Sequence, residues 1–291
     1  MRFITASLIS LLYFFPMYVD AANNTEPIVL KEKNIQIYDS VLSGFRAAFN
    51  KKIQVFDIGD ESIRNKKAPL VITIGSEALA QAVKNKGVRE IVYAMVLSPD
   101  IPDQISATGV DLVVSFGDQF KVVRETLPAV KRIGILYSPE TSRYFNQAME
   151  AAAKQGLTIV GRLMVSDADI ASAMGKLNGK IDLIFLLPDS QVLTVGSLKY
   201  IMLYSDANKM PVFGLSQTYV ENGALMALSL DPYDIGRQAG EMVKKISKGE
   251  NIKSIPPEYA RKWKLILNMS VAQKMGIPIP KEVLKTAVQI R

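Results

Sequence analysis

The sequence predicts an α/β protein made of two lobes. Short segments rich in β-branched residues alternate with amphipathic segments of helical period over most of the 291 residues, which is typical of parallel sheets covered by crossover helices. Several strand candidates, such as residues 70–74 and 181–187, are unbroken apolar runs, as expected of strands that are buried on both faces. The candidate strands are too many for one sheet of usual size, and this length suits two lobes.

Each element is predicted from its own pattern. Strands are expected at residues 53–56, 70–74, 90–96, 111–115, 132–137, 157–160, 181–187, 211–214, 224–230 and 264–267. Helices are expected at residues 39–50, 77–85, 119–127, 141–155, 168–177, 192–208 and 235–247, where apolar residues recur every three or four positions. Gly156 and Gly249 follow the last periodic residue of a helix, a position at which glycine commonly ends one.

The composition excludes several kinds of chemistry. The chain contains no Cys and no His, which removes disulfides, thiol nucleophiles, Cys/His zinc sites and every catalytic triad with an imidazole base. An enzyme would have to use Asp, Glu, Lys, Tyr or Ser, and none of these residues is grouped at catalytic spacing. The sequence therefore predicts a protein that is not an enzyme, with no cofactor and no metal.

The chain is basic, with 35 Lys and Arg against 28 Asp and Glu and a formal charge of +7. Such a balance often indicates a nucleic acid or an acidic membrane surface as partner. The cations are spread along the whole length, however, and their densest groups, around residues 244–248 and 261–264, are short and lack interleaved aromatic residues. We therefore expect a solvated basic surface and no nucleic acid partner.

Residues 1–21 have the pattern of a cleavable signal peptide. Arg2 precedes an apolar run from residue 3 to residue 19, and small residues follow at Ala21 and Ala22. The alternative is an uncleaved membrane anchor, although the run is short for a spanning helix and contains Pro16. The pattern favours export with removal of residues 1–21.

Polar residues follow several predicted strands. Gly75 and Ser76 come after residues 70–74, and Asp189 comes after residues 181–187. Parallel strands end at one edge of a sheet, and open α/β sheets bind ligands at that edge. The simpler interpretation of each residue on its own is that Ser76 and Asp189 cap the helices that follow them. The same order of strand, polar loop and helix occurs at Ser138, Ser216 and Asp231.

The order of these motifs resembles that of the periplasmic substrate-binding proteins of ABC transporters with the type I binding-protein fold, and most of all the tryptophan- and phenylalanine-type binders, many of which have no known ligand. The resemblance extends almost end to end after the signal. The matching segments include LVITIGSEA at 70–78, IVYAMVLSP at 91–99, LPAVKRIGILYSP at 127–139, LPD at 187–189, PVFG at 211–214 and residues 223–236.

This resemblance implies two Rossmann-like lobes with parallel sheets, joined by a hinge of three crossings, and a ligand held in the cleft between them. The crossings are expected near residues 116–120, 231–232 and 255–257. The first lobe would then contain residues 22–118 and 232–254, and the second lobe residues 119–231 and 255–291.

The resemblance also implies a set of ligand-binding residues. These are Ser40, Ser76, Ser98, Ser138, Asp189, Ser216 and Asp231. In amino-acid binders of this type, a carboxylate binds the ligand ammonium, a role open to Asp189 or Asp231. Hydroxyl and N–H groups at helix starts bind the ligand carboxylate, a role open to Ser76 or Ser138. The first strand and its loop are expected around residues 35–40. This segment is short and matches poorly, although the loop normally supplies cleft contacts, and this leaves the ligand class open.

The function implied is that of a periplasmic solute-binding component of an ABC importer. Its partners would be a small-molecule ligand, such as an amino acid, and an inner-membrane ABC permease, with hinge closure on binding. The alternative is a secreted sensor or adaptor of the same fold, whose partner is a membrane sensor protein and whose cleft is degenerate or regulatory.

Overall fold

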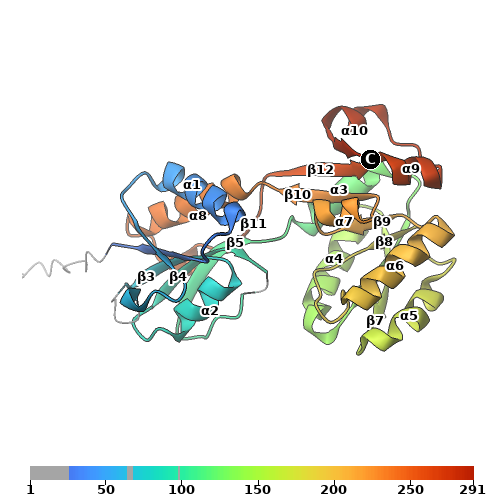
Figure 1. The fold of residues 1–291 in the computed structure, drawn as a ribbon. Coiled ribbons are helices and arrows are strands. Elements are labelled where there is room, and N and C mark those ends of the chain that lie inside the picture. Colours follow the sequence, from blue (N-terminus) through green and yellow to red (C-terminus); the bar gives the residue numbers. More distant parts are fainter. Residues whose placement is uncertain (1–25, 64–67, 98) are drawn as a thin grey trace, which may run out of the picture.

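The protein has two α/β lobes joined side by side (Figure 1). The computed structural model describes residues 26–63, 68–97 and 99–291. The expected signal segment, residues 1–21, and the predicted site residue Ser98 lie outside the described residues. In the described part of the chain, no helix is both long and apolar enough to cross a membrane.

The first lobe is built on a six-stranded sheet of order β11-β5-β4-β3-β1-β2. All of its neighbouring strands pair in parallel. Helices α1 and α8 pack on one face of this sheet and α2 on the other. The elements are β1 (Ile28–Lys31), α1 (Gln36–Phe49), β2 (Gln54–Asp57), β3 (Leu70–Ile74), α2 (Ser76–Lys84), β4 (Glu90–Val96), β5 (Ser106–Asp111), α8 (Pro232–Ile246) and β11 (Glu258–Tyr259).

The second lobe is built on a seven-stranded sheet of order β13-β12-β10-β9-β8-β6-β7. Its neighbouring strands are parallel except for the antiparallel pair β10 and β12. The elements are α3 (Phe116–Thr126), β6 (Arg132–Tyr137), α4 (Ser142–Lys154), β7 (Thr158–Leu163), α5 (Ile170–Leu177), β8 (Leu183–Phe185), α6 (Val195–Asn208), β9 (Val212–Gly214), α7 (Gln217–Glu221), β10 (Met226–Leu230), β12 (Trp263–Asn268), α9 (Met269–Met275), α10 (Lys281–Thr286) and β13 (Val288–Ile290).

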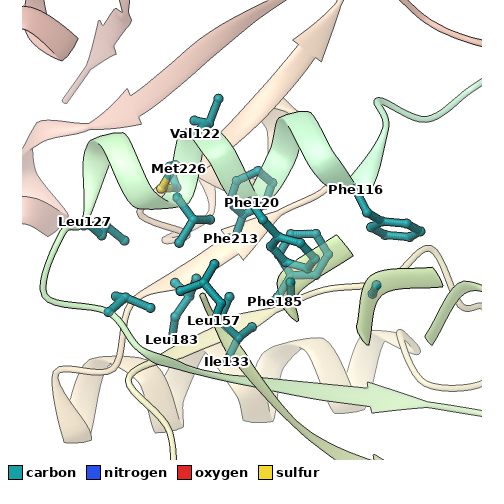
Figure 2. Close-up of a cluster of buried hydrophobic side chains, with 14 of the residues drawn as sticks. Phe116, Phe120, Val122, Leu127, Ile133, Leu157, Leu183, Phe185, Phe213 and Met226 are labelled. Carbon is teal, nitrogen blue, oxygen red and sulfur yellow. The ribbon is translucent and has the colours of Figure 1, made fainter. Parts of the chain in front are cut away.

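Aromatic side chains fill the core between α3 and the second sheet (Figure 2). Phe120 on α3 is fully buried, and its ring centroid lies 5.1 Å from that of Phe185 on β8. Phe185 in turn lies 4.9 Å from Phe213 on β9. Tilted rings at these distances gain a contact beyond the burial of their area. This packing fixes α3, which directly follows the first crossing, on the second lobe.

The first and third crossings differ from the expectation by a few residues. The first crossing lies between Asp111, the last residue of β5, and Phe116, the first residue of α3. Gly117 and Asp118, which suggested a later break, lie in the first turn of α3, where the Asp118 N–H donates to the Ser115 hydroxyl at 3.1 Å. An acidic residue is favourable in a first helical turn, so it marks the start of the helix there.

The third crossing comes later than Pro256 and Pro257. Glu258 and Tyr259 form β11, which pairs with β5 of the first sheet, so the chain leaves the first lobe only after Tyr259. The remaining crossing runs from Leu230 at the end of β10 to Pro232 at the start of α8.

Two strand predictions were wrong. A strand was expected at residues 111–115, but Asp111 ends β5 and residues 112–115 form the first crossing. The residues of β5, SATGVD, are too small and polar to predict a strand. The segment around residues 35–40 was expected to contain the first strand and its loop, but it runs into helix α1, and the first strand is β1. The alternating Ile35 and Ile37 resemble a strand, whereas the buried residues Val41, Leu42 and Phe45 follow a helical period.

Candidate functional site

The carboxyl edges of both sheets face the region between the lobes. β5 leaves the first sheet at its carboxyl end to cross into the second lobe, and β10 leaves the second sheet at its carboxyl end to cross back. Loops that follow the parallel strands of either lobe therefore meet between the lobes, as is usual for ligand sites in open α/β sheets.

Asp189 lies at this edge, buried at 4% exposure, and both of its carboxylate oxygens accept hydrogen bonds. The N–H of Ser138 donates to Oδ2 at 2.8 Å, and the hydroxyl of Thr141 donates to the same oxygen. The N–H groups of Gln191 and Val192 each donate to Oδ1 at 3.0 Å. Asp189 thus ties the loop after β6 to the loop after β8.

The pKa of Asp189 reflects these bonds. Burial alone would raise it, but the hydrogen bonds from Thr141, Val192 and Ser138 outweigh burial and lower the pKa. The expectation that Asp189 caps the following long helix was wrong. Thr194 is the N-cap of α6, its hydroxyl accepting from the Ser197 N–H at 3.2 Å, and Asp189 instead closes the turn before that helix.

Ser76 is exposed at the first position of α2, and the N-cap is Gly75. Gly75 has a φ of 97°, and a Cβ there would lie 2.6 Å from the hydroxyl of Tyr38 on α1. Only glycine combines this backbone with so close an approach. Tyr38 therefore covers the start of α2, and Ser40, half-buried, lies two residues further along α1.

The remaining predicted residues lie at strand or helix ends. Ser138 is buried at the end of β6. Ser216 is half-buried at the N-cap of α7, where its side chain makes no capping hydrogen bond. Asp231 is the N-cap of α8 and accepts from the Asp234 N–H at 3.2 Å. The structure brings Ser138 and Asp189 into direct contact.

The structure also shows a group of interacting residues that was not predicted from the sequence, which we call the interlobe cluster. It consists of Tyr93, Asp111 and Tyr259 from the first lobe and of Arg143 and Tyr144 from the second. The Tyr93 hydroxyl donates to Asp111 Oδ1 at 3.0 Å. The Arg143 guanidinium carbon lies 5.4 Å from the centre of the Tyr144 ring.

The charges of the cluster influence one another across the two lobes. Burial raises the pKa of Asp111, while the Tyr93 hydrogen bond and the positive charge of Arg143 oppose that rise. Burial is the main cause that raises the pKa of Tyr93 and of Tyr259, and the negative charge of Asp111 raises both further. The positive charge of Arg143 again opposes the change. Arg143 on α4 is therefore near enough to act on three side chains of the first lobe.

Strand pairing explains why Tyr93 can occupy this position. Its partner on β5 is Gly109, and a Cβ at Gly109 would lie 2.5 Å from Cγ of the Tyr93 ring. Such a Cβ would also lie 2.3 Å from the Tyr93 carbonyl oxygen, so a larger residue would displace both the backbone and the ring of Tyr93. The sequence carried a signal here, a glycine inside a strand beside an aromatic residue, but only the register of β4 and β5 reveals it.

A small apolar cavity of about 70 Å³ lies close to the first crossing. It is lined by Leu112 and Phe116 next to that crossing and by Pro188, Leu215 and Leu230 at strand ends of the second lobe. Pro188 directly precedes Asp189, so apolar surface adjoins the polar strand ends. Within the described ranges, no group of three or more acidic residues converges in a way that could hold a metal ion.

Two sheets with facing carboxyl edges, a hinge of crossings and charged groups shared between the lobes define a two-lobed ligand-binding protein. The profile of the family described as "ABC transporter substrate binding protein" matches residues 28–291. The chain belongs to this family, and its fold is the type I periplasmic binding protein fold.

Named relatives agree with this assignment. A "Tyrosine-binding protein" of Clostridioides difficile (strain R20291) is 23% identical over 250 residues, which are 82% of this chain and 72% of the relative. A Streptococcus pneumonia structure described as an ABC domain in complex with L-Trp is 22% identical, with a TM-score of 0.60, 91% of this chain covered and 99% of that one. The ligand-free, open structure of a substrate binding protein with adhesive properties from Clostridium difficile is 19% identical, with a TM-score of 0.68 and the same coverage.

Proposed function

We propose that this protein is the solute-binding component of an ABC importer and that it captures an aromatic amino acid between its lobes by hinge closure. The proposal rests on one observation above all. Asp111 at the end of β5 and Arg143 at the start of α4 are opposite charges on opposite lobes, near enough to interact electrostatically.

An amino acid is complementary to such a pair. Its ammonium group would bind Asp111 of the first lobe and its carboxylate would bind Arg143 of the second, each through charge-assisted hydrogen bonds. A ligand that bridges the lobes binds the closed form better and so shifts the hinge equilibrium. In this assignment Asp111 takes the ammonium role for which the sequence suggested Asp189 or Asp231.

The rings around the charges support an aromatic side chain. Tyr93 and Tyr144 are buried beside the charged pair, Tyr259 is exposed next to it, and the apolar cavity near Phe116 adjoins the strand ends. Aromatic rings stack favourably on such surfaces. Relatives described as a tyrosine-binding protein and as an L-Trp complex support the same ligand class.

The wider setting follows from the family. We propose a periplasmic location after removal of residues 1–21, an inner-membrane ABC permease as partner and no catalytic turnover. None of the relatives named above favours the sensor or adaptor alternative, and all three are described as binding a ligand or belonging to an ABC or substrate-binding class.

Isothermal titration with tyrosine, tryptophan and phenylalanine tests the ligand class. Two analogues of tyrosine provide internal controls, namely tyramine, which lacks the carboxylate, and 3-(4-hydroxyphenyl)propionate, which lacks the ammonium. The complete amino acid should bind, and each analogue should bind at least about tenfold more weakly, because a charge-assisted hydrogen bond is worth about 1.5–3 kcal/mol.

Variants assign the two halves of the ligand. Asp111→Asn should abolish the preference for tyrosine over the propionate, and Arg143→Gln the preference for tyrosine over tyramine. The exposed Asp103→Asn and Lys154→Gln are matched controls and should leave both preferences unchanged. If no amino acid binds, or if Asp111→Asn binds tyrosine as well as the parent does, the assignment fails.

A further inference from the structure

A cluster of exposed cations lies at the end of the first lobe, which we call the basic end. It consists of Arg46, Lys51 and Lys52 at the end of α1 and beyond it, and of Lys244, Lys245, Lys248 and Lys253 at the end of α8 and in the loop after it. None of these seven side chains takes part in an ion pair within the described part of the chain.

Helix packing brings the two halves of the basic end together. A Cβ on Gly236 of α8 would lie 1.9 Å from the Val41 carbonyl oxygen of α1, and one on Gly240 would lie 2.9 Å from the Ala48 Cβ. The two helices therefore run in the same direction in close contact, so their last turns lie side by side. Segments 44–54 and 244–254 together hold these seven cations and a single acidic residue, Glu250.

The chain enters the first lobe at this same end. Ile28, the first residue of β1, pairs with Gln54, which lies two residues after Lys52. In Figure 1, α1 and α8 lie along one face of the first lobe, and the dark blue strand begins on the side of this lobe that points away from the second lobe. The sequence before this entry includes the apolar run at residues 3–19.

We propose that the basic end is a docking surface for the anionic phospholipid headgroups of the membrane through which the protein is exported. Unpaired cations on one face are attracted to an anionic bilayer surface, and the attraction adds up over the residues that reach it. The described chain reaches β1 at this end, so the basic end is where the exported chain joins the fold. The amino edge of the sheet then faces the membrane and the carboxyl edge, with the interlobe cluster, stays open to solvent.

This surface is independent of the amino-acid site, since Asp111 and Arg143 lie at the opposite edge of the strands. Docking on an anionic membrane would also account for part of the excess of Lys and Arg without nucleic acid binding. Electrostatic docking of this kind is reversed by salt, because screening shortens the reach of each charge.

Vesicle co-sedimentation tests the proposal, using the exported form of the protein purified from its host. The readout is the ratio of binding to vesicles of phosphatidylglycerol and phosphatidylcholine over binding to vesicles of phosphatidylcholine alone, so any contribution of retained apolar residues cancels. We expect a clear preference for anionic vesicles at low salt that disappears at about 0.5 M salt, where screening is strong. The triple variant Lys52→Gln, Lys244→Gln, Lys248→Gln should lower this preference about tenfold or more.

The matched control is Lys154→Gln, Lys180→Gln, Lys199→Gln, which removes three exposed charges from the second lobe and should keep the preference. Both triple variants should keep the thermal unfolding of the parent. Equal binding to neutral and anionic vesicles, or an equal loss in the control variant, would overturn the proposal. If the protein bound duplex DNA as strongly as anionic vesicles, and the triple variant of the basic end weakened both equally, the surface would be one for nucleic acid instead.

Discussion

Two aspartates at facing strand ends have opposite pKa shifts, and the difference comes from their hydrogen-bond donors. Asp189 accepts four hydrogen bonds from its own lobe, which outweigh burial and lower its pKa. Asp111 accepts one from Tyr93, and burial prevails and raises its pKa. The first arrangement stabilises a fold, and the second leaves a carboxylate that gains from an added cation.

We expect Asp189→Asn to destabilise the protein by about 1.5–3 kcal/mol, the range for hydrogen bonds to a charged group. The Asn side chain keeps one oxygen as an acceptor, but its NH₂ takes the place of the other oxygen. That NH₂ would then face a hydroxyl or N–H group that also donates. Because the pKa of Asp189 is lowered, its contribution is fully present above the ordinary Asp pKa of 3.8 and is lost as the pH falls through the lowered value. Chemical denaturation near pH 7 measures the difference.

Asp103→Asn is the control for this substitution, since Asp103 is exposed and such surface changes are usually worth less than about 0.5 kcal/mol. Equal stability of the Asp189 and Asp103 variants would show that the four hydrogen bonds contribute nothing net.

The raised pKa of Asp111 predicts a pH dependence of ligand affinity. The protonated carboxyl cannot neutralise an ammonium group, so affinity should be constant at higher pH and fall by up to about tenfold per pH unit below the raised pKa, which lies above 3.8. Asp189 stays ionised over that range because its pKa is lowered. Titration calorimetry from pH 7 downwards should show this fall in the parent and a flat profile in Asp111→Asn; a flat profile in both would contradict the role of Asp111.

At the scale of elements, the first lobe depends on the packing of α1 against α8, which approach each other most closely at glycine residues. Gly236 of α8 faces the backbone of Val41, and Gly44 of α1 faces the backbone of Tyr233 at a virtual Cβ distance of 1.8 Å. The backbones of α1 and α8 are thus in direct contact, and this contact also sets the position of Asp231, the N-cap of α8.

We expect Gly236→Ala to destabilise the first lobe by about 1–3 kcal/mol, because the added methyl group meets a backbone atom that cannot move alone. The matched substitution is Gly175→Ala on α5, where a Cβ would meet nothing within 4 Å. That substitution should stabilise by about 0.5–1 kcal/mol through helix propensity. Thermal unfolding of the two variants measures both; the same sign for both would show that the close approach is not what constrains position 236.

The sequence predicts elements well where local pattern and burial agree. The strands β3, β4 and β6 have the expected bounds, since each is a run of apolar residues ended by a turn. β5 could not be predicted, because Thr108 and Gly109 are not apolar enough to indicate a strand by themselves. These two residues suit the strand because of their partners on the neighbouring strand β4.

The site residues show the same limit. Ser138 and Asp189 were predicted from their positions after strands, and they do meet. Tyr93, however, lies inside a strand and reads as core, and Arg143 lies in the first turn of a helix on the other lobe. Their proximity depends on how the two lobes are joined, which local sequence does not encode.

At the scale of the whole molecule, the crossings form a strip of hydrogen-bonded segments. The Ala260 N–H donates to the Val113 carbonyl at 3.2 Å, and the Asp231 N–H donates to the Lys262 carbonyl at 3.1 Å. Arg261 anchors the strip to α8 by donating to Asp234 at 2.9 Å and to Glu241 at 2.8 Å. Connected crossings restrict the relative motion of the lobes to bending about the strip.

Ligand binding should therefore bend this strip and bring the lobes together. Moving the hinge equilibrium from 1:99 to 99:1 takes about 5.5 kcal/mol of differential affinity, which two charge-assisted hydrogen bonds and the burial of an aromatic side chain can provide. Small-angle scattering should show a smaller radius of gyration with tyrosine than without it. Trp263, the only tryptophan, starts β12 directly after the strip, so its fluorescence should change over the same concentration range.

In Arg143→Gln, tyrosine should lose its bond to the second lobe and cause less closure at saturation. If tyrosine bound tightly while both signals stayed constant, binding would not require closure, and the opposite charges on the two lobes would have another purpose.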